Sequence, residues 1–252
     1  MKTRNDPVIL SHSYPRLSHF AMTRWIPLES NPEWANKAGL DKEELQFSDI
    51  YGLDEELLDM VSKPVKAVLL LFPISKTLEA KRREEDDLIR SEASSPSLFN
   101  SVIWIKQTIS NACGTIGLLH ALANTGIKFA PGSPLAQFIE ACKDKTPEER
   151  AEFLETTPLF AEIHAETAST GQSAVPTDLD TDLHFTCFVE AEMEGVPHVV
   201  ELDGRRAGIM DRGKIYNDLL TDVASLVKET YIKGSSGSIQ FSMTSLGPPA
   251  EW

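Results

Sequence analysis

The stretch Gln107-Thr-Ile-Ser-Asn-Ala-Cys113-Gly-Thr115 is the part of the sequence from which the fold is best predicted. It lies between an apolar run with β propensity, Val102–Ile105, and an apolar run with helical character, Ile116–Ala123. A cysteine in the first turn of a helix lies near unpaired backbone N–H groups and their partial positive charge. That charge favours the thiolate, which is the nucleophilic form of cysteine. The stretch therefore predicts a reactive cysteine at the start of a helix.

Three polar residues outside this helix complete a candidate catalytic set. Gln107 lies six residues before Cys113, and its side-chain amide could donate a hydrogen bond to a developing oxyanion. His184, near the start of an apolar run that we interpret as a strand, is the candidate general base and acid. Asp203 is the candidate acceptor that orients the imidazole and stabilises the imidazolium. The order Gln, Cys, His, Asp is that of papain-like thiol hydrolases.

Each of these residues also has an ordinary structural interpretation. A cysteine at a helix start can be a small buried apolar residue, and a strand histidine can bond to the backbone. An Asp-Gly pair such as Asp203-Gly204 commonly forms a turn, and a glutamine can be a surface residue. Because all four residues occur in one order, we favour the catalytic interpretation.

Four separated motifs resemble one family, the ubiquitin carboxyl-terminal hydrolases, which are thiol peptidases that cut after the last glycine of ubiquitin. The motifs are Trp25–Pro32, Gln107–Gly117, His184-Phe185 and Leu202–Arg205, and the resemblance extends from Trp25 to about Leu246. It implies an α+β, papain-like fold with a central, mostly antiparallel sheet and helices on both sides. It also implies a knotted backbone, which is an exception to the usual rule, and a crossover loop over the active site.

The resemblance implies deubiquitination through a thioester acyl-enzyme, with Cys113 as nucleophile and without a metal or cofactor. Small adducts and short peptide tails are then expected to be released better than folded conjugates. Two alternatives stay open, a ubiquitin-binding module that has lost catalysis and a hydrolase of a ubiquitin-like modifier such as Nedd8. The His184–Asp203 spacing, 203 − 184 = 19, is longer than in typical family members. We expect the excess in the Glu190–His198 hairpin; a shift of strand register would instead turn Asp203 away and favour Asp211.

The surface that contacts ubiquitin is predicted only from the resemblance. It comprises the opening segment, part of the crossover loop and the start of the last strand, namely Pro27, Leu28, Glu29, Ser30, Asn31, Pro32, Thr167, Ala168, Ser169, Thr170, Ser238, Ile239, Gln240 and Phe241. The loop is also indicated by composition, because residues 161–180 hold few large aliphatic side chains. Long structureless loops in compact domains are uncommon and usually functional.

The bulk properties exclude several classes of protein. The chain has 252 residues, 41% hydrophobic and 25% charged, which is typical of a globular protein of one or two domains. A net charge of −14 argues against nucleic acid and anionic membranes as partners and suits a basic partner such as the face of ubiquitin around its tail. No apolar run reaches the roughly 18 residues of a membrane span. We expect a monomer.

The cysteines favour a reducing compartment. Cys113, Cys142 and Cys187 are few, odd in number and widely spaced, which argues against a disulfide framework or a cysteine zinc site. We interpret Cys142 and Cys187 as buried thiols. The expected location is the cytoplasm, with the nucleus as an alternative.

The chain divides into three predicted parts. Residues 1–24 form an N-terminal extension that we expect to be disordered, although its Ser- and Arg-bearing, acid-poor composition also resembles a mitochondrial transit peptide. Residues 25–246 form the catalytic domain, and residues 247–252 form a C-terminal tail.

Periodicity and turn residues predict the secondary structure. Helices are expected from Ser30 to Ala38, from Asp54 to Met60, from Thr77 to Ser91, from Pro134 to Lys143, from Pro147 to Glu155 and from Tyr216 to Ile232. Strands are expected at Phe47–Tyr51, Val65–Phe72, His184–Val189, Val196–Leu202 and Ser238–Met243. Ser110 or Asn111 is expected to cap the Cys113 helix. His120 is expected to lie too deep to join the active site, while His164 and His198 are expected to be solvated.

Overall fold

The computed structural model describes residues 32–92, 101–158, 160–169 and 182–250. Its helices are α1 (Pro32–Ala38), α2 (Glu55–Leu58), α3 (Lys76–Glu92), α4 (Cys113–Ala123), α5 (Pro134–Cys142), α6 (Pro147–Thr156), α7 (Ala161–Ser169), α8 (Leu219–Leu226) and the π-helix η1 (Val227–Ile232). Its strands are β1 (Gln46–Asp49), β2 (Ala67–Pro73), β3 (Leu183–Met193), β4 (Val196–Leu202), β5 (Met210–Lys214) and β6 (Ser242–Gly247). No helix among these residues is long and apolar enough to cross a membrane.

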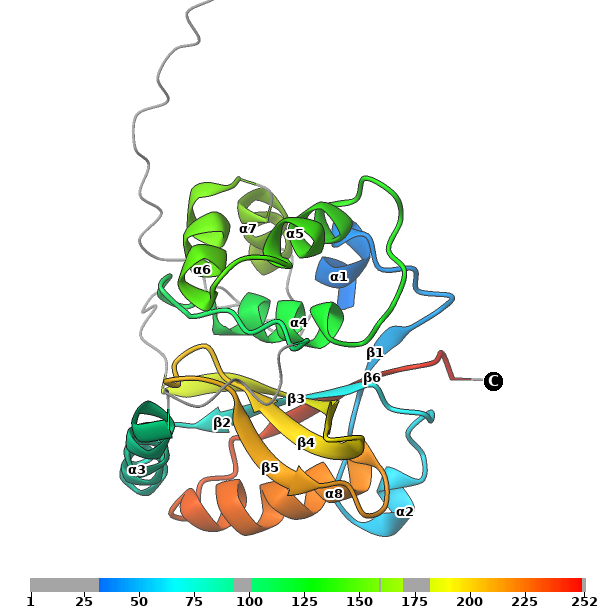
Figure 1. The fold of residues 1–252 in the computed structure, drawn as a ribbon. Coiled ribbons are helices and arrows are strands. Elements are labelled where there is room, and N and C mark those ends of the chain that lie inside the picture. Colours follow the sequence, from blue (N-terminus) through cyan, green and yellow to red (C-terminus); the bar gives the residue numbers. More distant parts are fainter. Residues whose placement is uncertain (1–31, 93–100, 159, 170–181, 251–252) are drawn as a thin grey trace, which may run out of the picture.

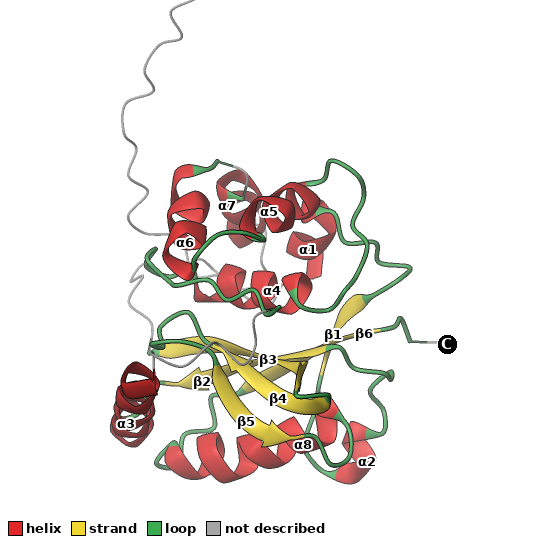
Figure 2. Cartoon of the chain, viewed as in Figure 1, coloured by secondary structure: helices red, strands yellow, loops and turns green. Residues whose placement is uncertain are grey.

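The sheet is antiparallel throughout, with the strand order β1-β6-β2-β3-β4-β5. Helices α1, α4, α5, α6 and α7 lie on one side of it, and α8 and α2 lie on the other, with α3 beside the end of β2 (Figure 1 and Figure 2). The predicted α+β architecture with helices on both sides is therefore confirmed. The backbone knot stays a prediction.

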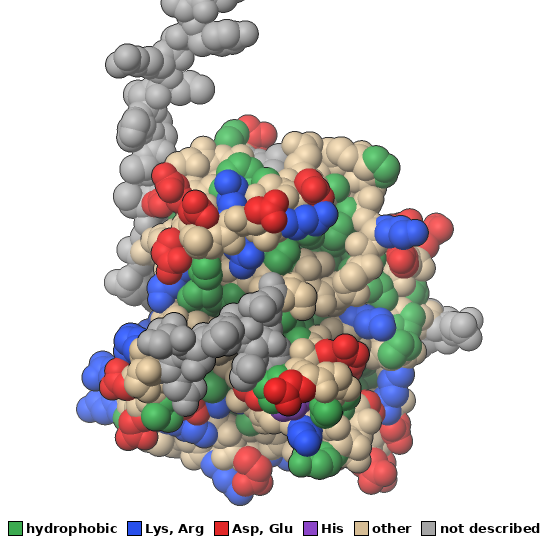
Figure 3. All heavy atoms as spheres, viewed as in Figure 1, with side chains coloured by type: hydrophobic (Ala, Val, Ile, Leu, Met, Phe, Trp, Pro, Cys, Tyr) green, Lys and Arg blue, Asp and Glu red, His purple; other side chains and the backbone are tan. Residues whose placement is uncertain are grey.

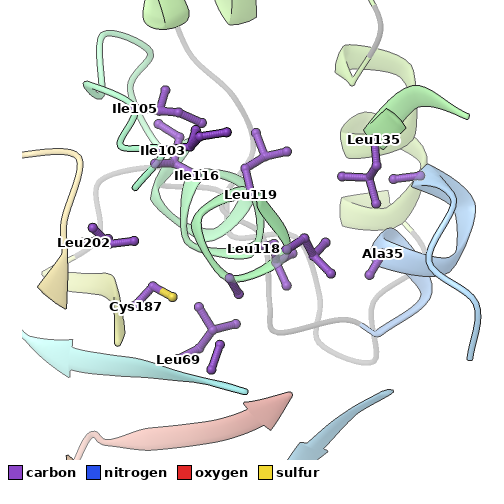
Figure 4. Packing of buried hydrophobic residues seen from close by; sticks show 14 of the residues in the cluster. Ala35, Leu69, Ile103, Ile105, Ile116, Leu118, Leu119, Leu135, Cys187 and Leu202 are labelled. Atoms are coloured by element: carbon purple, nitrogen blue, oxygen red, sulfur yellow. The ribbon is translucent and has the colours of Figure 1, made fainter. Parts of the chain in front are cut away.

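The two faces of the sheet bury two separate cores because side chains alternate along a strand. Leu69 and Cys187 point to the first core, where α4 lies. Leu70 and Phe188 point to the second core, beneath α8. Helix α4 is buried on almost every side, since it lies between the sheet and the outer helices (Figure 4). A helix that is apolar all round is expected in such a position.

The hairpin that carries the candidate histidine forms as predicted. Strands β3 and β4 pair from Met193↔Val196 to Cys187↔Leu202. The two residues between them, Glu194 and Gly195, have φ of 53° and 80°, which is the left-handed pair that two-residue hairpins favour. The turn sets the register of the pair. That the excess spacing between His184 and Asp203 lies in this hairpin stays a prediction.

Several predicted elements agree with the structure to within a few residues. The predicted Thr77–Ser91 helix is α3, and the two proline-led helices are α5 and α6. Helix α6 begins at a capping box in which Thr146 and Glu149 bond each other's backbone N–H groups. The predicted Tyr216–Ile232 helix begins only at Leu219, because the Asp218 side chain caps it there by accepting from Thr221 N–H. Strand β5 was not predicted.

The predicted last strand, Ser238–Met243, is wrong by four residues. The structure places β6 at Ser242–Gly247, between β1 and β2 in the sheet. Ile239, at the centre of the predicted strand, is 93% exposed. The segment Met243–Leu246 is buried and pairs with β1 on one edge and with β2 on the other, so it forms the strand. Such tertiary contacts override local β propensity.

The predicted structureless loop at residues 161–180 is wrong in its first half. Residues 161–169 form α7, which packs against α1. Lys37 of α1 donates to Glu166 of α7 at 2.7 Å. Residues 170–181 lie outside the described residues, as do the predicted N-terminal extension and the last residues of the predicted tail.

Candidate active site

Cys113 is the first residue of α4, as the sequence predicts. The N-cap residue is Ala112, with φ −87°, ψ 3° and no side-chain cap hydrogen bond, so the predicted cap at Ser110 or Asn111 is wrong. Asn111 instead has a φ of 62° and turns the chain into the helix. The first α-helical hydrogen bond joins Ile116 N–H to the Ala112 carbonyl at 2.8 Å. The backbone N–H groups before it are the ones that a helix start leaves for other acceptors.

His184 and Asp203 meet at the start of β3 as predicted from their order. The His184 Nε2 atom lies 2.7 Å from Asp203 Oδ1, and both side chains are at least 96% buried. The His184 ring packs edge-on against Phe72, its cross-strand partner on β2. The ring also interacts with the thiol of Cys113, and each of the two groups shifts the pKa of the other. The structure thus brings nucleophile, imidazole and carboxylate into one chain of contacts.

The electrostatics of this trio favour a thiolate–imidazolium pair. Burial raises the pKa of the Cys113 thiol, but the hydrogen bond and charge of His184 and a backbone hydrogen bond at Phe185 lower that pKa overall. Burial lowers the pKa of His184, but the charge and hydrogen bond of Asp203 and the bond to Cys113 raise it to about 9. Burial raises the pKa of Asp203, but His184 holds it well below its usual range. Opposite charges that face each other stabilise both ionised forms.

The turn after β4 holds Asp203 by its backbone. The indole of Trp104 donates to the Asp203 carbonyl at 3.0 Å. The backbone N–H of Arg205 donates to Asp203 Oδ1 at 2.8 Å, beside the bond to His184. The alternative carboxylate, Asp211, pairs instead with His198 at 2.9 Å. The long spacing between His184 and Asp203 therefore does not turn Asp203 away.

Gln107 is joined to the same turn. Its backbone N–H donates to the Gly204 carbonyl at 2.8 Å, so the oxyanion candidate and Asp203 lie on adjacent segments. Its side-chain Nε2 donates to the Ile109 carbonyl at 3.2 Å. A side-chain amide carries two N–H donors, and this bond leaves one for a ligand.

The three other described histidines are buried. His120 bonds Ile105 N–H and the Leu202 carbonyl, deep in α4, as predicted. The predictions that His164 and His198 are solvated are wrong, because they are 3% and 4% exposed. His164 Nδ1 lies 2.8 Å from the Thr115 hydroxyl. This contact ties α7 to the nucleophile helix, and nothing in the local sequence signals it because the two residues are 49 apart.

The other two cysteines are buried thiols, as predicted. Burial raises the pKa of Cys142 to about 11 and raises the pKa of Cys187 further. All three cysteines are free, and Cys113 is the most exposed of them. Cys113 is therefore the thiol suited to nucleophilic chemistry. Among the described residues, no group of three or more His, Cys, Asp or Glu side chains could hold a metal ion.

The predicted ubiquitin contacts fall on three parts of the chain. Pro27–Asn31 and Thr170 lie outside the described residues, and Pro32 begins α1. Thr167, Ala168 and Ser169 end α7, and the Thr167 side chain is buried, so it presents no surface to a partner in this conformation. Ser238–Phe241 form the loop before β6, where Ile239 is exposed.

Comparison with known proteins gives one consistent family. The family described as "Ubiquitin carboxyl-terminal hydrolase, family 1" matches residues 25–233. Ubiquitin carboxyl-terminal hydrolase 3 of Arabidopsis thaliana is 41% identical over 229 residues, covering 88% of this chain and 94% of that protein. Ubiquitin carboxyl-terminal hydrolase isozyme L1 of Equus caballus is 34% identical, covering 87% and 96%. The fold resembles the UCH37 catalytic domain of Trichinella spiralis, solved bound to ubiquitin vinyl methyl ester, with a TM-score of 0.70, 24% identity and coverage of 91% and 98%.

Proposed function

Because the chain belongs to family 1 of the ubiquitin carboxyl-terminal hydrolases, we propose that it hydrolyses the bond after the C-terminal glycine of ubiquitin. Cys113 is the nucleophile, His184 is the general base and acid, and Asp203 orients His184. The observation that carries this assignment is the chain of contacts from the Cys113 thiol through the His184 ring to Asp203 at 2.7 Å. Nucleophile, base and orienting group in hydrogen-bond reach are the signature of an activated nucleophile.

The reaction proceeds in two acyl-transfer steps. The Cys113 thiolate attacks the carbonyl carbon of the last glycine, and the His184 imidazolium gives its proton to the departing amine as the C–N bond breaks. The resulting thioester is hydrolysed by a water that gives a proton to the neutral His184, and the thiolate leaves with the original charge. Asp203 keeps the ring oriented throughout and stabilises its charged form.

The oxyanion of each step needs hydrogen-bond donors. The second Nε2 hydrogen of Gln107 and the backbone N–H at the start of α4 are the donors that support this role. The α4 dipole adds a favourable partial charge at the same place. Donors fixed in advance cost no reorganisation in the transition state.

Labelling with ubiquitin vinyl sulfone tests the assignment. We expect one covalent adduct per chain, on the peptide that holds Cys113, with Cys142 and Cys187 unmodified in the same digest. The Cys113→Ala variant serves as the matched control and should remain unlabelled. A chain that binds ubiquitin without forming the adduct would be a binding module, and the proposal would then be wrong.

The substrate preference is tested with two further comparisons. A ubiquitin–fluorophore amide should be cleaved faster than a folded di-ubiquitin, since the resemblance implies a restricted route for the leaving group. Parallel rates on the ubiquitin and Nedd8 amides decide which modifier is preferred. We further propose that the protein acts in a reducing compartment, the cytoplasm or the nucleus, since its chemistry requires a free Cys113 thiol. The monomeric state stays a prediction.

A further inference from the structure

Four charged side chains fill the space between α3 and the sheet beside the candidate catalytic pair. We call them the ion network, and its members are Glu85 of α3, Glu201 of β4, Arg206 of the β4–β5 turn and Arg212 of β5. The Glu201 side chain is fully buried, and the two arginines are at least 91% buried. A cavity of about 20 Å³ lies against the network and the catalytic pair together, since both Arg206 and His184 line it. The network is therefore adjacent to the site.

The members of the ion network are paired in a closed ring. Arg212 donates to Glu201 Oε2 at 2.6 Å and to both oxygens of Glu85 at 2.8 and 3.1 Å. Arg206 donates to Glu85 Oε2 at 2.7 Å, and its Nε lies 3.4 Å from Glu201 Oε1. Two acids and two bases leave no net charge. A change at any one of them leaves an uncompensated buried charge, which is costly.

The network reaches Asp203 through the turn that follows it. Arg206 lies three residues after Asp203, and its backbone N–H donates to the Asp203 carbonyl at 3.1 Å. The charge of Arg206 also lowers the pKa of Asp203. The next residue, Ala207, donates its N–H to Asp86 of α3 at 3.1 Å. The turn is thus fastened to α3 both by an ion pair and by its backbone.

The network reaches His184 through β3 and η1. Thr186, two residues after His184 on the same sheet face, donates to Glu201 Oε1 at 3.1 Å. The Tyr231 hydroxyl donates to the same oxygen at 2.6 Å. The Tyr231 ring packs against Phe72, which packs against the His184 ring. One buried carboxylate therefore anchors Thr186 on the strand of His184 and Tyr231 beneath the ring that packs on His184.

We propose that the ion network is a positioning device: it holds Asp203 against His184 and sets the potential in which the Cys113–His184 pair ionises. Its members touch neither the substrate nor the thiol, so they are positioning residues. As it concerns catalysis, the inference rests on the proposed function. A purely stabilising role would not require charges, because buried ion pairs are often replaced by apolar residues without loss of stability.

Other charged and titratable groups surround the same site and are left unchanged by the test. They are Glu79, Lys81, Arg82 and Asp86 of α3, Lys106 of the segment before α4, His120 of α4, Arg205 of the turn and Tyr231 of η1. Because these groups are the same in every variant, a difference in the alkylation midpoint between variants reports the effect of the substituted charge.

The test compares the pH dependence of Cys113 alkylation by iodoacetamide, followed by mass spectrometry of the full chain. The alkylation rate follows the thiolate and needs no ubiquitin. Glu85→Gln leaves excess positive charge, so the midpoint should move to lower pH by about half to one unit. Arg206→Gln leaves excess negative charge, so the midpoint should move to higher pH by a similar amount. The double variant Glu85→Gln/Arg206→Gln restores neutrality and should return to the wild-type midpoint.

The controls distinguish a change of electrostatic potential at Cys113 from a loss of folded structure. Glu84→Gln removes the same charge one residue away, from the exposed face of α3, and should leave the alkylation midpoint unchanged. Charges of both signs are interleaved over the surface seen in Figure 3, so the loss of one surface charge is screened by solvent and salt. Arg206→Lys keeps the charge and should keep the midpoint, with Tm recorded for every variant. The inference is overturned if the two single variants move the midpoint in the same direction, if neither moves it, or if the double variant lies furthest from wild type.

Cleavage of a ubiquitin–fluorophore amide, measured in parallel, keeps the two proposals distinct. Opposite shifts of the alkylation midpoint without turnover by the wild type would overturn the proposed function and leave the network's effect on Cys113 established. Turnover without the opposite shifts would overturn the network inference alone.

Discussion

Replacing Gly204 with alanine tests whether the contact between the Asp203 turn and the Gln107 segment is required for catalysis. A Cβ at position 204 would lie 2.9 Å from Gln107 Cβ, 3.1 Å from Gln107 N and 3.2 Å from the Ile105 carbonyl oxygen. Ordinary contacts of a Cβ begin at 3.4 Å. Two of the three obstructing atoms belong to the backbone and cannot rotate away, so the two segments must separate by about half an ångström.

That separation is expected to lower both the free energy of unfolding and the catalytic rate. Overpacking of this kind costs about 1–3 kcal/mol of unfolding free energy, and the 2.8 Å bond from Gln107 N–H to the Gly204 carbonyl must lengthen. A misplacement of about 1 Å in a catalytic group can cost about 10²-fold in rate. For half that displacement, shared between Gln107 and Asp203, we expect kcat and kcat/KM to fall together by about tenfold.

The assay is the hydrolysis of a ubiquitin–fluorophore amide over a range of concentrations, with Tm measured by calorimetry. Gly208→Ala is the matched control, since it lies in the same turn and its Cβ would meet only a side-chain carbon, Ile89 Cγ2, at 3.1 Å. That side chain can move, so Gly208→Ala should keep kcat within about twofold. A Gly204→Ala enzyme with wild-type kcat would refute the close approach or its catalytic importance.

The remaining predictions concern the catalytic residues and one helix cap. Cys113→Ser should abolish turnover while calorimetric binding of ubiquitin stays near wild type, because the predicted binding surfaces lie elsewhere; loss of both would indicate a folding defect or a wrong assignment. Gln107→Ala should lower kcat by about 10²–10³-fold, with only the small loss of Tm expected from the missing bond to the Ile109 carbonyl. A smaller loss of kcat would mean that the backbone N–H groups suffice. The pH profile of kcat/KM should rise through the lowered pKa of Cys113 and fall as His184 loses its proton near its pKa of about 9; Asp203→Asn removes the charge that raises the His184 pKa, so the alkaline limb should move to lower pH. The pKa of His184 in the folded protein lies above its ordinary value of 6.5, so the charged ring adds to the free energy of unfolding below pH 6.5. This contribution is lost as pH rises through about 9. Denaturant titrations should show a smaller loss in Asp203→Asn. Thr146→Ala removes one half of the α6 capping box and should lower the unfolding free energy by about 1 kcal/mol with unchanged kinetics.

Local sequence rules predicted the elements whose signals lie within a few residues. The nucleophile stands at the start of α4, the β3–β4 hairpin turns at Glu194-Gly195, and α6 starts after Thr146. At α6 the Thr146 side chain bonds a backbone N–H three residues on, and at the hairpin two adjacent residues adopt positive φ, so neighbours in the chain are sufficient there. The same rules failed at Asn111, where the backbone turns into α4 without a side-chain cap.

Residues far apart in the chain decided what those rules could not predict. Strand β6 runs from Ser242 because both of its edges pair, and α7 forms because it packs on α1. His164 and His198 are buried because Thr115 and Asp211 meet them from other elements. Hydrophobic periodicity shows which face of a helix or strand is buried, but it does not show which other element packs against that face.

The sequence by itself determined which four residues carry the candidate chemistry and the order in which they occur. Only the tertiary structure decided that His184 and Asp203 meet at 2.7 Å, that Gln107 is joined to the same turn, and that a ring of buried ion pairs lies beside them. The physical reason is that the pKa of a thiol or an imidazole depends on burial and on charges within a few ångströms. Those distances follow from strand register and packing, which arise only when the whole chain has folded.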